Sequence, residues 1–316
     1  MNNIIFICPY FGKFPKHFEL WLKSCKMNLD CKWIIYTDDK RKFDFPKNVE
    51  VNYCTLADLQ KKFSKKLGFE VSLKTIRKLG DYKPLFGFLF EDEIEGFKSW
   101  GHLDVNDSIY GQITKIITSQ ILDNYNKIMF CGHMSIYKNT KENNRMFMKK
   151  FKSGIDYKKI FTDDAFYNFE EIGPISITKL YRENNIDIKN LTGKYADISF
   201  KKYNMVIGGV KENIDEYYLL NNNHVVFSWE NGSIYGYFIN KNKIDKKEFI
   251  YIHLKRRNLN FKCNPKSDKF IINQNGFYDY VNIDKKYILD NDKKKIFYKP
   301  FIYSKINEFK TKKRRK

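Results

Sequence analysis

The chain has few cysteines, and their spacing does not fit a metal-binding or disulfide-rich module. Its six cysteines are scattered, none belongs to a CxxC pair, and no histidine spacing completes a zinc site. Several fall in apolar stretches typical of buried strands. We therefore expect reduced thiols in the core of a cytoplasmic protein, which disfavours a zinc module or a disulfide-stapled secreted domain.

The sequence also lacks a long apolar run. No stretch approaches the roughly 20 apolar residues of a membrane-spanning helix. Residues 4–8 are apolar, but Pro9 ends this run and no basic segment precedes it, so it is too short for a secretory signal. There is no internal repeat either. These absences predict a soluble or peripheral protein.

Aromatic residues and lysine are abundant instead. The 28 Phe and 22 Tyr, with 42% apolar residues overall, supply enough material for a core in a chain of 316 residues. The net charge of +21 favours an anionic partner such as nucleic acid, anionic lipid or a phosphorylated small molecule, although a generally lysine-rich composition also raises it. Six of the last seven residues, 310–316, are basic, and we expect a disordered arm that an anionic membrane surface attracts.

The order of predicted elements in the first part of the chain indicates an α/β fold. Three short apolar runs alternate with two amphipathic stretches: strands at 3–8, 32–39 and 49–54, and helices at 15–28 and from Thr55, a favourable N-cap. This alternation is typical of a mainly parallel sheet, in which a ligand binds beyond the carboxyl ends of the strands. Residues 9–12 and 37–39 occupy those ends.

The remaining sequence continues this pattern and then becomes irregular. We expect a helix of about 15 residues within 79–97, a strand at 99–105, a single strand at 126–139, a helix capped by Asn139 or Thr140, a hairpin at 221–240 with an Asn-Gly-Ser turn, and a strand at 248–257. Beyond about residue 256 no period is clear, and we interpret that part as an appendage.

The stretch WGHLDVNDSIYG places three oxygen-bearing side chains at the end of the strand at 99–105. Asp104 and Asn106 lie on the same side of an extended chain, and Asp107 follows. Together they can hold one hard cation such as Mg²⁺ or Mn²⁺, with phosphate oxygens completing its shell. A polar turn that caps a following helix would use the same residues. The spacing alone leaves both interpretations open.

Four segments, in order, carry a family resemblance. They are residues 9–39, 81–111, 132–148 and 248–257. They resemble the donor-binding core of GT-A type glycosyltransferases and, more narrowly, a bacterial family from capsule and surface-polysaccharide gene clusters. The resemblance implies a GT-A (nucleotide-diphospho-sugar transferase) Rossmann-like mixed sheet with helices on both faces over 1–255, a small C-terminal appendage at 256–309, and the basic tail at 310–316.

The resemblance also implies an activity and a location. The enzyme would move a sugar from a nucleotide-sugar donor, with UDP as the expected nucleotide, to a cell-surface glycan or lipid-linked acceptor, as in capsule or lipopolysaccharide biosynthesis. It would use Mn²⁺ or Mg²⁺. It would act in the cytoplasm, with the basic tail holding it peripherally at the inner face of the membrane.

The candidate site residues fall into three groups, and each has a plainer structural interpretation. The metal ligands would be Asp104, Asn106, Asp107 and the late residue His253; the donor-binding residues would be Pro9, Tyr10, Phe11, Asp38, Asp39, Lys83 and Lys255; the residues at the reacting groups would be Asp81, Glu170 and Glu171. Glu170 or Glu171 is the expected base if the reaction inverts the anomeric centre. The plainer interpretations are turns, helix caps, a core histidine and solvated surface charges.

Asn106 departs from the resembled family, which normally has Asp at this position. Its amide oxygen can still bind a cation, but one negative charge is missing. The alternatives are therefore a non-catalytic GT-A-like scaffold, or, because of the charge of +21, a nucleic-acid-binding protein or metal-dependent nuclease. Nucleic acid is the less favoured partner, since the lysines are spread along the chain and no known nucleic-acid-binding motif occurs.

Overall fold

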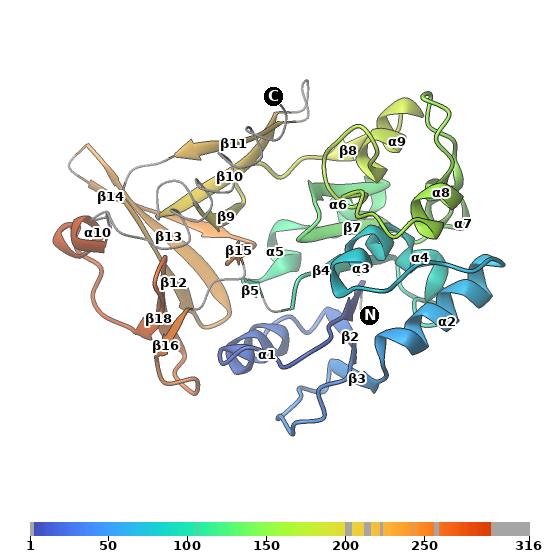
Figure 1. Cartoon of the computed structure of the whole chain (residues 1–316). Helices are drawn as coiled ribbons and strands as arrows, with labels where there is room; N and C mark the ends of the chain where they lie inside the picture. The colour runs from blue at the N-terminus through green and yellow to red at the C-terminus, as the bar shows by residue number, and fades with distance from the viewer. Residues whose placement is uncertain are drawn as a thin grey trace, which may run out of the picture.

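Three β-sheets and the helices that pack on them make up the described part of the chain (Figure 1). The structure is a computed structural model, and it describes residues 3–105, 107–199, 204–211, 216–221, 224–241, 243–255 and 259–291. Asn106 and the tail at 310–316 therefore lie outside the described residues. The fold is mixed α/β, as the sequence predicts.

The first sheet has seven strands. Their order is β3 (Val49–Tyr53), β2 (Cys31–Thr37), β1 (Ile4–Pro9), β4 (Ser99–Leu103), β7 (Met134–Lys138), β6 (Lys127–Cys131) and β8 (Ile188–Lys189). Strands β1 to β4 run parallel, and only β7 is antiparallel to its neighbours. The prediction of a mainly parallel sheet is confirmed.

Alternating side chains of β1 pack into two separate cores. Ile4 and Phe6 lie on the face that α1 (Phe18–Lys26) covers, while Ile5 and Ile7 lie on the other face. That second face is covered by α2 (Leu56–Leu67), α3 (Leu79–Tyr82), α4 (Phe86–Leu89), α8 (Tyr157–Thr162) and α9 (Ile177–Glu183). Because a strand's period is two, an uninterrupted apolar run such as β1 serves both layers.

Local signals account for the first helices. Thr55 caps α2 in a reciprocal capping box with Asp58, as predicted, and Gly68 ends the helix in a left-handed conformation with φ +78°. Thr140 likewise caps α7 (Lys141–Asn144), which is shorter than predicted. The other short helical segments are α5 (Ile113–Ile116), α6 (Ser119–Asn124), and 3₁₀ turns at Ile76–Lys78 and Met146–Met148.

The predicted helix of about 15 residues within 79–97 is wrong. The segment is broken into α3, a 3₁₀ turn at Lys83–Leu85 and α4, and turns follow to residue 96. Pro84 has no backbone N–H to donate, and Gly87 lies so close to the Trp100 indole that a Cβ there would approach it to 2.3 Å. The break therefore separates Asp81, which lies in α3, from Lys83, which begins the 3₁₀ turn.

The predicted single strand at 126–139 is also corrected. It is the hairpin β6–β7, with Gly132 and His133 at its turn. The ladder is irregular between Ile128 and Cys131, where Met129 has φ +72°. The hairpin brings its turn to the carboxyl end of β4.

Two further sheets lie beside the first, on the left of Figure 1. One has the order β11 (Glu216–Asn221), β10 (Met205–Lys211), β9 (Tyr195–Ile198), β15 (Tyr251–His253) and β5 (Ser108–Tyr110). The other has the order β14 (Lys243–Phe249), β13 (Ser233–Asn240), β12 (Val225–Glu230), β17 (Lys269–Asn273), β18 (Gly276–Asp279) and β16 (Asn260–Lys262). The helix α10 (Lys285–Asn291) follows.

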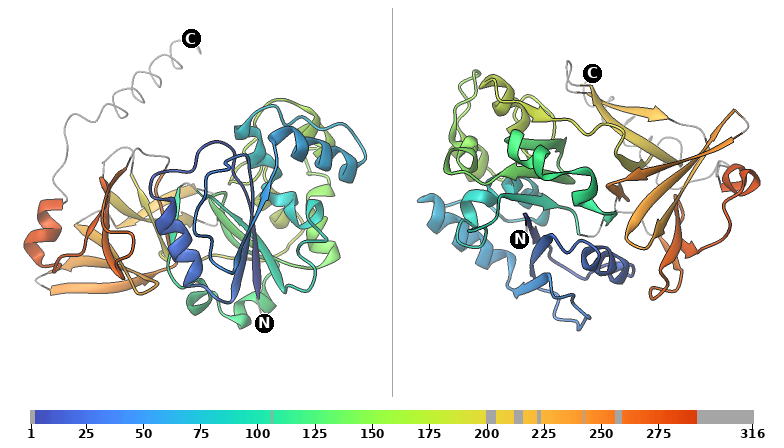
Figure 2. Two further views of the ribbon diagram at one scale, coloured as in Figure 1. Left: turned by 90° about the horizontal axis from the view of Figure 1, so that it is seen from below. Right: turned by 180° about the vertical axis from the view of Figure 1, so that it is seen from behind.

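The hairpin prediction is confirmed, and the appendage is more ordered than its sequence suggests. Strands β12 and β13 pair on either side of Asn231 and Gly232. Strand β12 also pairs with β17, so the predicted boundary at residue 255 runs between strands of one sheet. The views of Figure 2 show this sheet beside α1, and both contribute to one apolar cluster.

Asn28 links the first sheet's helix layer to the second sheet. Its side chain is buried, and its amide donates to the carbonyl oxygens of Ser24 at 2.9 Å and Gly111 at 2.8 Å. Its Oδ1 accepts from the N–H of Ile113 at 2.7 Å. All three bonds are to backbone, so this side chain fixes the end of α1 against the chain that leaves β5.

We expect Asn28→Ala to destabilise the protein by about 1–3 kcal/mol for each buried backbone group that it leaves unpaired. Thermal unfolding followed by circular dichroism measures this. Asn282→Ala, at an exposed position, is the matched control. An equal melting temperature for the two variants would contradict the linking role of Asn28.

Candidate functional site

A cavity of about 550 Å³ opens at the carboxyl ends of β1 and β4. Most of the predicted site residues line it: Pro9, Tyr10, Phe11, Lys83, Asp104, Asp107, Glu170, Glu171, His253 and Lys255. Residues that the sequence did not single out, among them Arg77, Phe166 and Asn168, complete its wall. This is the edge at which α/β sheets bind ligands.

Asp104, Asp107 and His253 form a group that can hold a metal ion. One ligand atom from each lies within 4.8 Å of the others. Asp104 follows β4, Asp107 precedes β5, and His253 ends β15. Pairing of β15 with β5 puts His253 opposite Ser108, and the N–H of Leu254 donates to the Asp107 carbonyl at 2.5 Å. The backbone ladder therefore delivers the distant histidine to the two carboxylates.

The donor set fits a divalent cation of intermediate hardness. Two carboxylates and one imidazole suit Mn²⁺, whereas Mg²⁺ favours a shell of oxygen atoms alone. Asp107 and His253 are held by the second sheet and Asp104 by the first, so the three candidate ligands meet where the two sheets adjoin. Asn106, predicted as a fourth ligand, lies outside the described residues.

Lys83 forms an ion pair with Asp104. Its Nζ donates to Asp104 Oδ1 at 2.7 Å and to the carbonyl oxygen of Gly132 at 2.9 Å. Burial alone would raise the pKa of Asp104, but the positive charges of Lys83 and His253 outweigh it and bring that pKa well below its ordinary value. Asp104 is therefore an anion, ready to bind a cation.

His253 is held by two neighbours. The His133 ring stacks on it, with 4.1 Å between ring centroids and 14° between planes. Asp197 Oδ1 lies 3.4 Å from His253 Nδ1, long for a hydrogen bond but within ion-pair distance, and Asp197 Oδ2 lies 2.7 Å from Lys255 Nζ. Burial lowers the pKa of His253, but Asp197 and then Asp104 outweigh it and raise that pKa.

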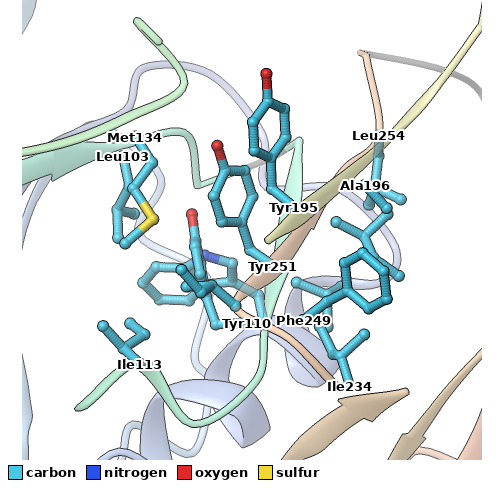
Figure 3. Close-up of a cluster of buried hydrophobic side chains, with 14 of the residues drawn as sticks. Leu103, Tyr110, Ile113, Met134, Tyr195, Ala196, Ile234, Phe249, Tyr251 and Leu254 are labelled. Atoms are coloured by element: carbon cyan, nitrogen blue, oxygen red, sulfur yellow. The ribbon is translucent and has the colours of Figure 1, made fainter. Parts of the chain in front are cut away.

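Three tyrosines of the second sheet lie next to the candidate metal ligands, and two of them make hydrogen bonds to His133 and to the backbone of Asp104. Figure 3 shows the rings of Tyr110, Tyr195 and Tyr251 with their hydroxyl groups pointing the same way. The Tyr251 hydroxyl is 2.9 Å from His133 Nδ1, and the Tyr110 hydroxyl donates to the backbone carbonyl of Asp104 at 3.2 Å. Stacking of Tyr195 on Tyr251 at 5.3 Å makes this support rigid.

Glu170 and Glu171 form an acidic wall of the same cavity. Burial raises the pKa of Glu170 to about 8 and outweighs the positive charge of Lys83, which lowers it. Among the described residues, no hydrogen-bond partner reaches Glu170 Oε2. Gly80 and Gly132 make room for these side chains, because a Cβ at either position would lie 2.4–2.6 Å from a carboxylate atom.

Asp38 and Asp39 stand behind the cavity instead of lining it. Asp38 Oδ1 accepts from the N–H of Gly12 at 2.6 Å, where φ is +94°. Asp39 accepts from the N–H of Phe14 at 2.8 Å and pairs with Arg41, whose hydrogen bonds lower its pKa. The two carboxylates shape the loop that presents residues 9–11 to the cavity.

Asp81 lies beneath the cavity, not in it. Its carboxylate is fully buried, pairs with Lys78 at 3.0 Å, and accepts from the N–H groups of Tyr167 at 3.0 Å and Phe169 at 2.9 Å. Asp81 and Lys83 are two residues apart, and their side chains point in different directions, Lys83 to the cavity and Asp81 to the core. Asp81 anchors the segment that leads to Glu170 and lies outside the cavity lining, whereas the resemblance places it at the reacting groups.

Sequence reasoning missed His133, Asp197 and Arg77. Gly132 and His133 between two apolar runs fit a tight hairpin turn, and that signal was available. Asp197 had no such signal, because its role depends on the pairing of β9 with β15. Arg77 stacks on Phe166, with 4.8 Å from the guanidinium to the ring centroid, at the wall near Glu170.

We expect Glu170→Gln to stabilise the protein at high pH. Glu170 takes up a proton on folding anywhere between its ordinary pKa of 4.5 and its folded value of about 8, so the free energy of unfolding falls as the pH rises through this window. A neutral amide removes that loss. We expect the melting temperature of the variant to exceed that of the wild type by at least about 2 °C at pH 9 and to match it near pH 4.

Glu95→Gln, at an exposed position, is the control and should show no such pH dependence. A variant that melts below the wild type at pH 9 would show that Glu170 is ionised and well paired in the folded protein.

Comparison with known proteins gives a family without a known activity. No curated protein matches the chain in sequence. The model of a family of unknown function, DUF6625, matches residues 6–281. This span contains every described residue of the cavity and the last strand of the third sheet. Because this match covers most of the length of the chain, the chain belongs to this family of unknown function.

Proposed function

We propose that the chain is a metal-dependent glycosyltransferase of the GT-A type, which moves a sugar from a UDP-linked or similar nucleotide-sugar donor to a glycan or lipid-linked acceptor. One observation carries the proposal: two carboxylates and a histidine from distant elements converge in a cavity that two lysines and two glutamates also line. Cationic groups suit a diphosphate, and a carboxylate suits the acceptor hydroxyl.

The arrangement of the first sheet supports this reading. Strands β3, β2, β1 and β4 run parallel in that order, and the cavity lies at their carboxyl ends. The loop at 9–11 follows the central strand β1 and lines the cavity with one buried and one half-buried aromatic ring. A nucleoside would bind at this loop, with Tyr10 or Phe11 against the base.

The basic side chains of the cavity would stabilise the leaving group, the diphosphate of the nucleotide. Bound at Asp104, Asp107 and His253, Mn²⁺ would supply positive charge to the diphosphate as the bond to the sugar breaks. Lys83 and Lys255 stand on either side of these ligands, each already in an ion pair. In that position their ammonium groups can neutralise the non-bridging phosphate oxygens, whose charge grows in the transition state.

Glu170 is the better candidate for the base of an inverting reaction. Its buried carboxyl group lines the cavity, and its raised pKa of about 8 makes it a stronger base than an ordinary glutamate once it is ionised. It would accept the proton of the acceptor hydroxyl. Glu171 is its less buried neighbour. A retaining reaction would leave Glu170 to bind the acceptor.

The proposed acceptor and the proposed location at a membrane surface are based on the positive charge of the chain. A chain with a net charge of +21, six units of it in residues 310–316, suits a lipid-linked acceptor at an anionic membrane surface. Among the described residues, no helix is both long and apolar enough to cross a membrane. Peripheral attachment through the tail is therefore part of the proposal.

Release of UDP from a panel of UDP-sugars with Mn²⁺ tests the activity. We expect turnover by the wild type, and a loss of at least about 100-fold in Asp104→Ala and His253→Ala, because each variant removes a cation ligand. Asp92→Ala, at an exposed site, should act like the wild type. No turnover of any sugar nucleotide, together with tight, salt-sensitive DNA binding, would favour the nucleic-acid alternative instead.

The pH dependence of the rate tests the base. We expect kcat/KM to rise with pH and level off above about pH 8, where Glu170 is ionised, since the protonated form cannot accept the acceptor's proton. Glu170→Gln should be slow at every pH and show no such rise. An unchanged pH profile in this variant would rule Glu170 out as the base.

A further inference from the structure

We infer that Asp197 is the positioning residue of the site, which fixes both the imidazole of His253 and the ammonium group of Lys255. The effect of Asp197 on metal and donor binding rests on the proposed function, whereas its contacts with His253 and Lys255 do not depend on it. Asp197 lies outside the group of metal ligands and outside the cavity lining. It acts through the two residues that line the cavity.

The pairing of two strands places Asp197 beside His253. Strands β9 and β15 run parallel, and Asp197 is the register partner of His253. Figure 3 shows their chain neighbours Ala196 and Leu254 close together on these strands. One carboxylate oxygen lies 3.4 Å from His253 Nδ1, and the other lies 2.7 Å from Lys255 Nζ. The single carboxylate thus lies within ion-pair distance of two cavity residues, while its Oδ1 also accepts from the backbone N–H of Ile198 at 2.7 Å.

This contact selects the face that His253 presents to the cavity. When the imidazole is neutral, a carboxylate beside Nδ1 favours the tautomer with the proton on that nitrogen, which leaves the lone pair of Nε2 for a cation. Stacking of His133 fixes the plane of the ring, and the Tyr251 hydroxyl holds His133 in turn. The imidazole is therefore preorganised before any cation binds.

The second contact holds Lys255 in an uncommon backbone conformation. Lys255 has φ +52°, a left-handed conformation that costs a non-glycine residue about 1–2 kcal/mol. The ion pair with Asp197 offsets part of this cost and directs the ammonium group along the cavity wall. Without this ion pair, the ammonium group of Lys255 would be free to move away from the place where the diphosphate of the proposed donor would bind.

Other charged groups lie near His253, but none of those named here is the ion-pair partner of its Nδ1. Asp104 and Asp107 lie on the cavity side of His253, where they are expected to bind the cation. Lys83 is engaged with Asp104 and Gly132. Asp197 lies 3.4 Å from His253 Nδ1 and 2.7 Å from Lys255 Nζ. It is the anion that contacts Nδ1.

The test compares the wild type with Asp197→Asn, which keeps the shape of the side chain and removes its charge. The first readout is the ¹⁵N spectrum of the His253 ring, taken without metal or nucleotide at a pH where the imidazole is neutral. We expect one tautomer, with the proton on Nδ1, in the wild type and a mixture in the variant. The second readout is Mn²⁺ affinity by titration of the metal alone, which should fall about 10–100-fold.

Two controls separate positioning from a structural role. Lys255→Met removes the second contact of Asp197 and should leave the tautomer of His253 unchanged. Asp197→Glu, which keeps the charge, should restore part of the Mn²⁺ affinity. The melting temperature of each variant shows that it is folded.

The outcomes are distinct. An unchanged tautomer in Asp197→Asn overturns the inference, whether or not the melting temperature falls. A tautomer mixture with weakened Mn²⁺ binding supports it. A tautomer mixture in a protein whose wild type binds no Mn²⁺ supports the positioning by Asp197 and sinks the proposed function.

Discussion

The pairing of β5 with β15 is the interaction on which the site depends. It joins Ser108–Tyr110 to Tyr251–His253, so residues more than a hundred positions apart in sequence share one ladder. The ladder continues into the bond from Leu254 to the Asp107 carbonyl. Through β4, the same stretch of chain is tied to the parallel sheet and to Asp104. Without this pairing, the carboxylates would remain a polar turn and His253 a distant histidine.

A second constraint is charge. The cavity gathers Asp104, Asp107, Glu170 and Glu171 in surroundings that are mostly buried, and unpaired charges there are costly. Lys83 pairs with Asp104, while burial leaves Glu170 protonated near neutral pH. A cation and a diphosphate, as the proposed function requires, would bring further charges of opposite sign into this cavity.

Much of the fold was predictable because its signals are local. The period of β1, the cap at Thr55 and the turn at Asn231–Gly232 each act within a few residues. The error at 79–97 came from giving Pro84 a place in the first turn of a continuous helix. The role of Asp197 could not be predicted, because it depends on the register with His253, 56 residues further along the chain, and neither strand's own sequence determines that register. Even so, ten of the fourteen residues predicted for the site line the cavity.

The central claim is that Asp104, Asp107 and His253 hold a divalent cation between the two sheets. Anomalous X-ray scattering from crystals grown with Mn²⁺ and UDP tests it most directly. The claim predicts one manganese peak within bonding distance of all three side chains, with the diphosphate beside it. A peak elsewhere, or UDP bound in the cavity with no manganese at these ligands, would contradict it.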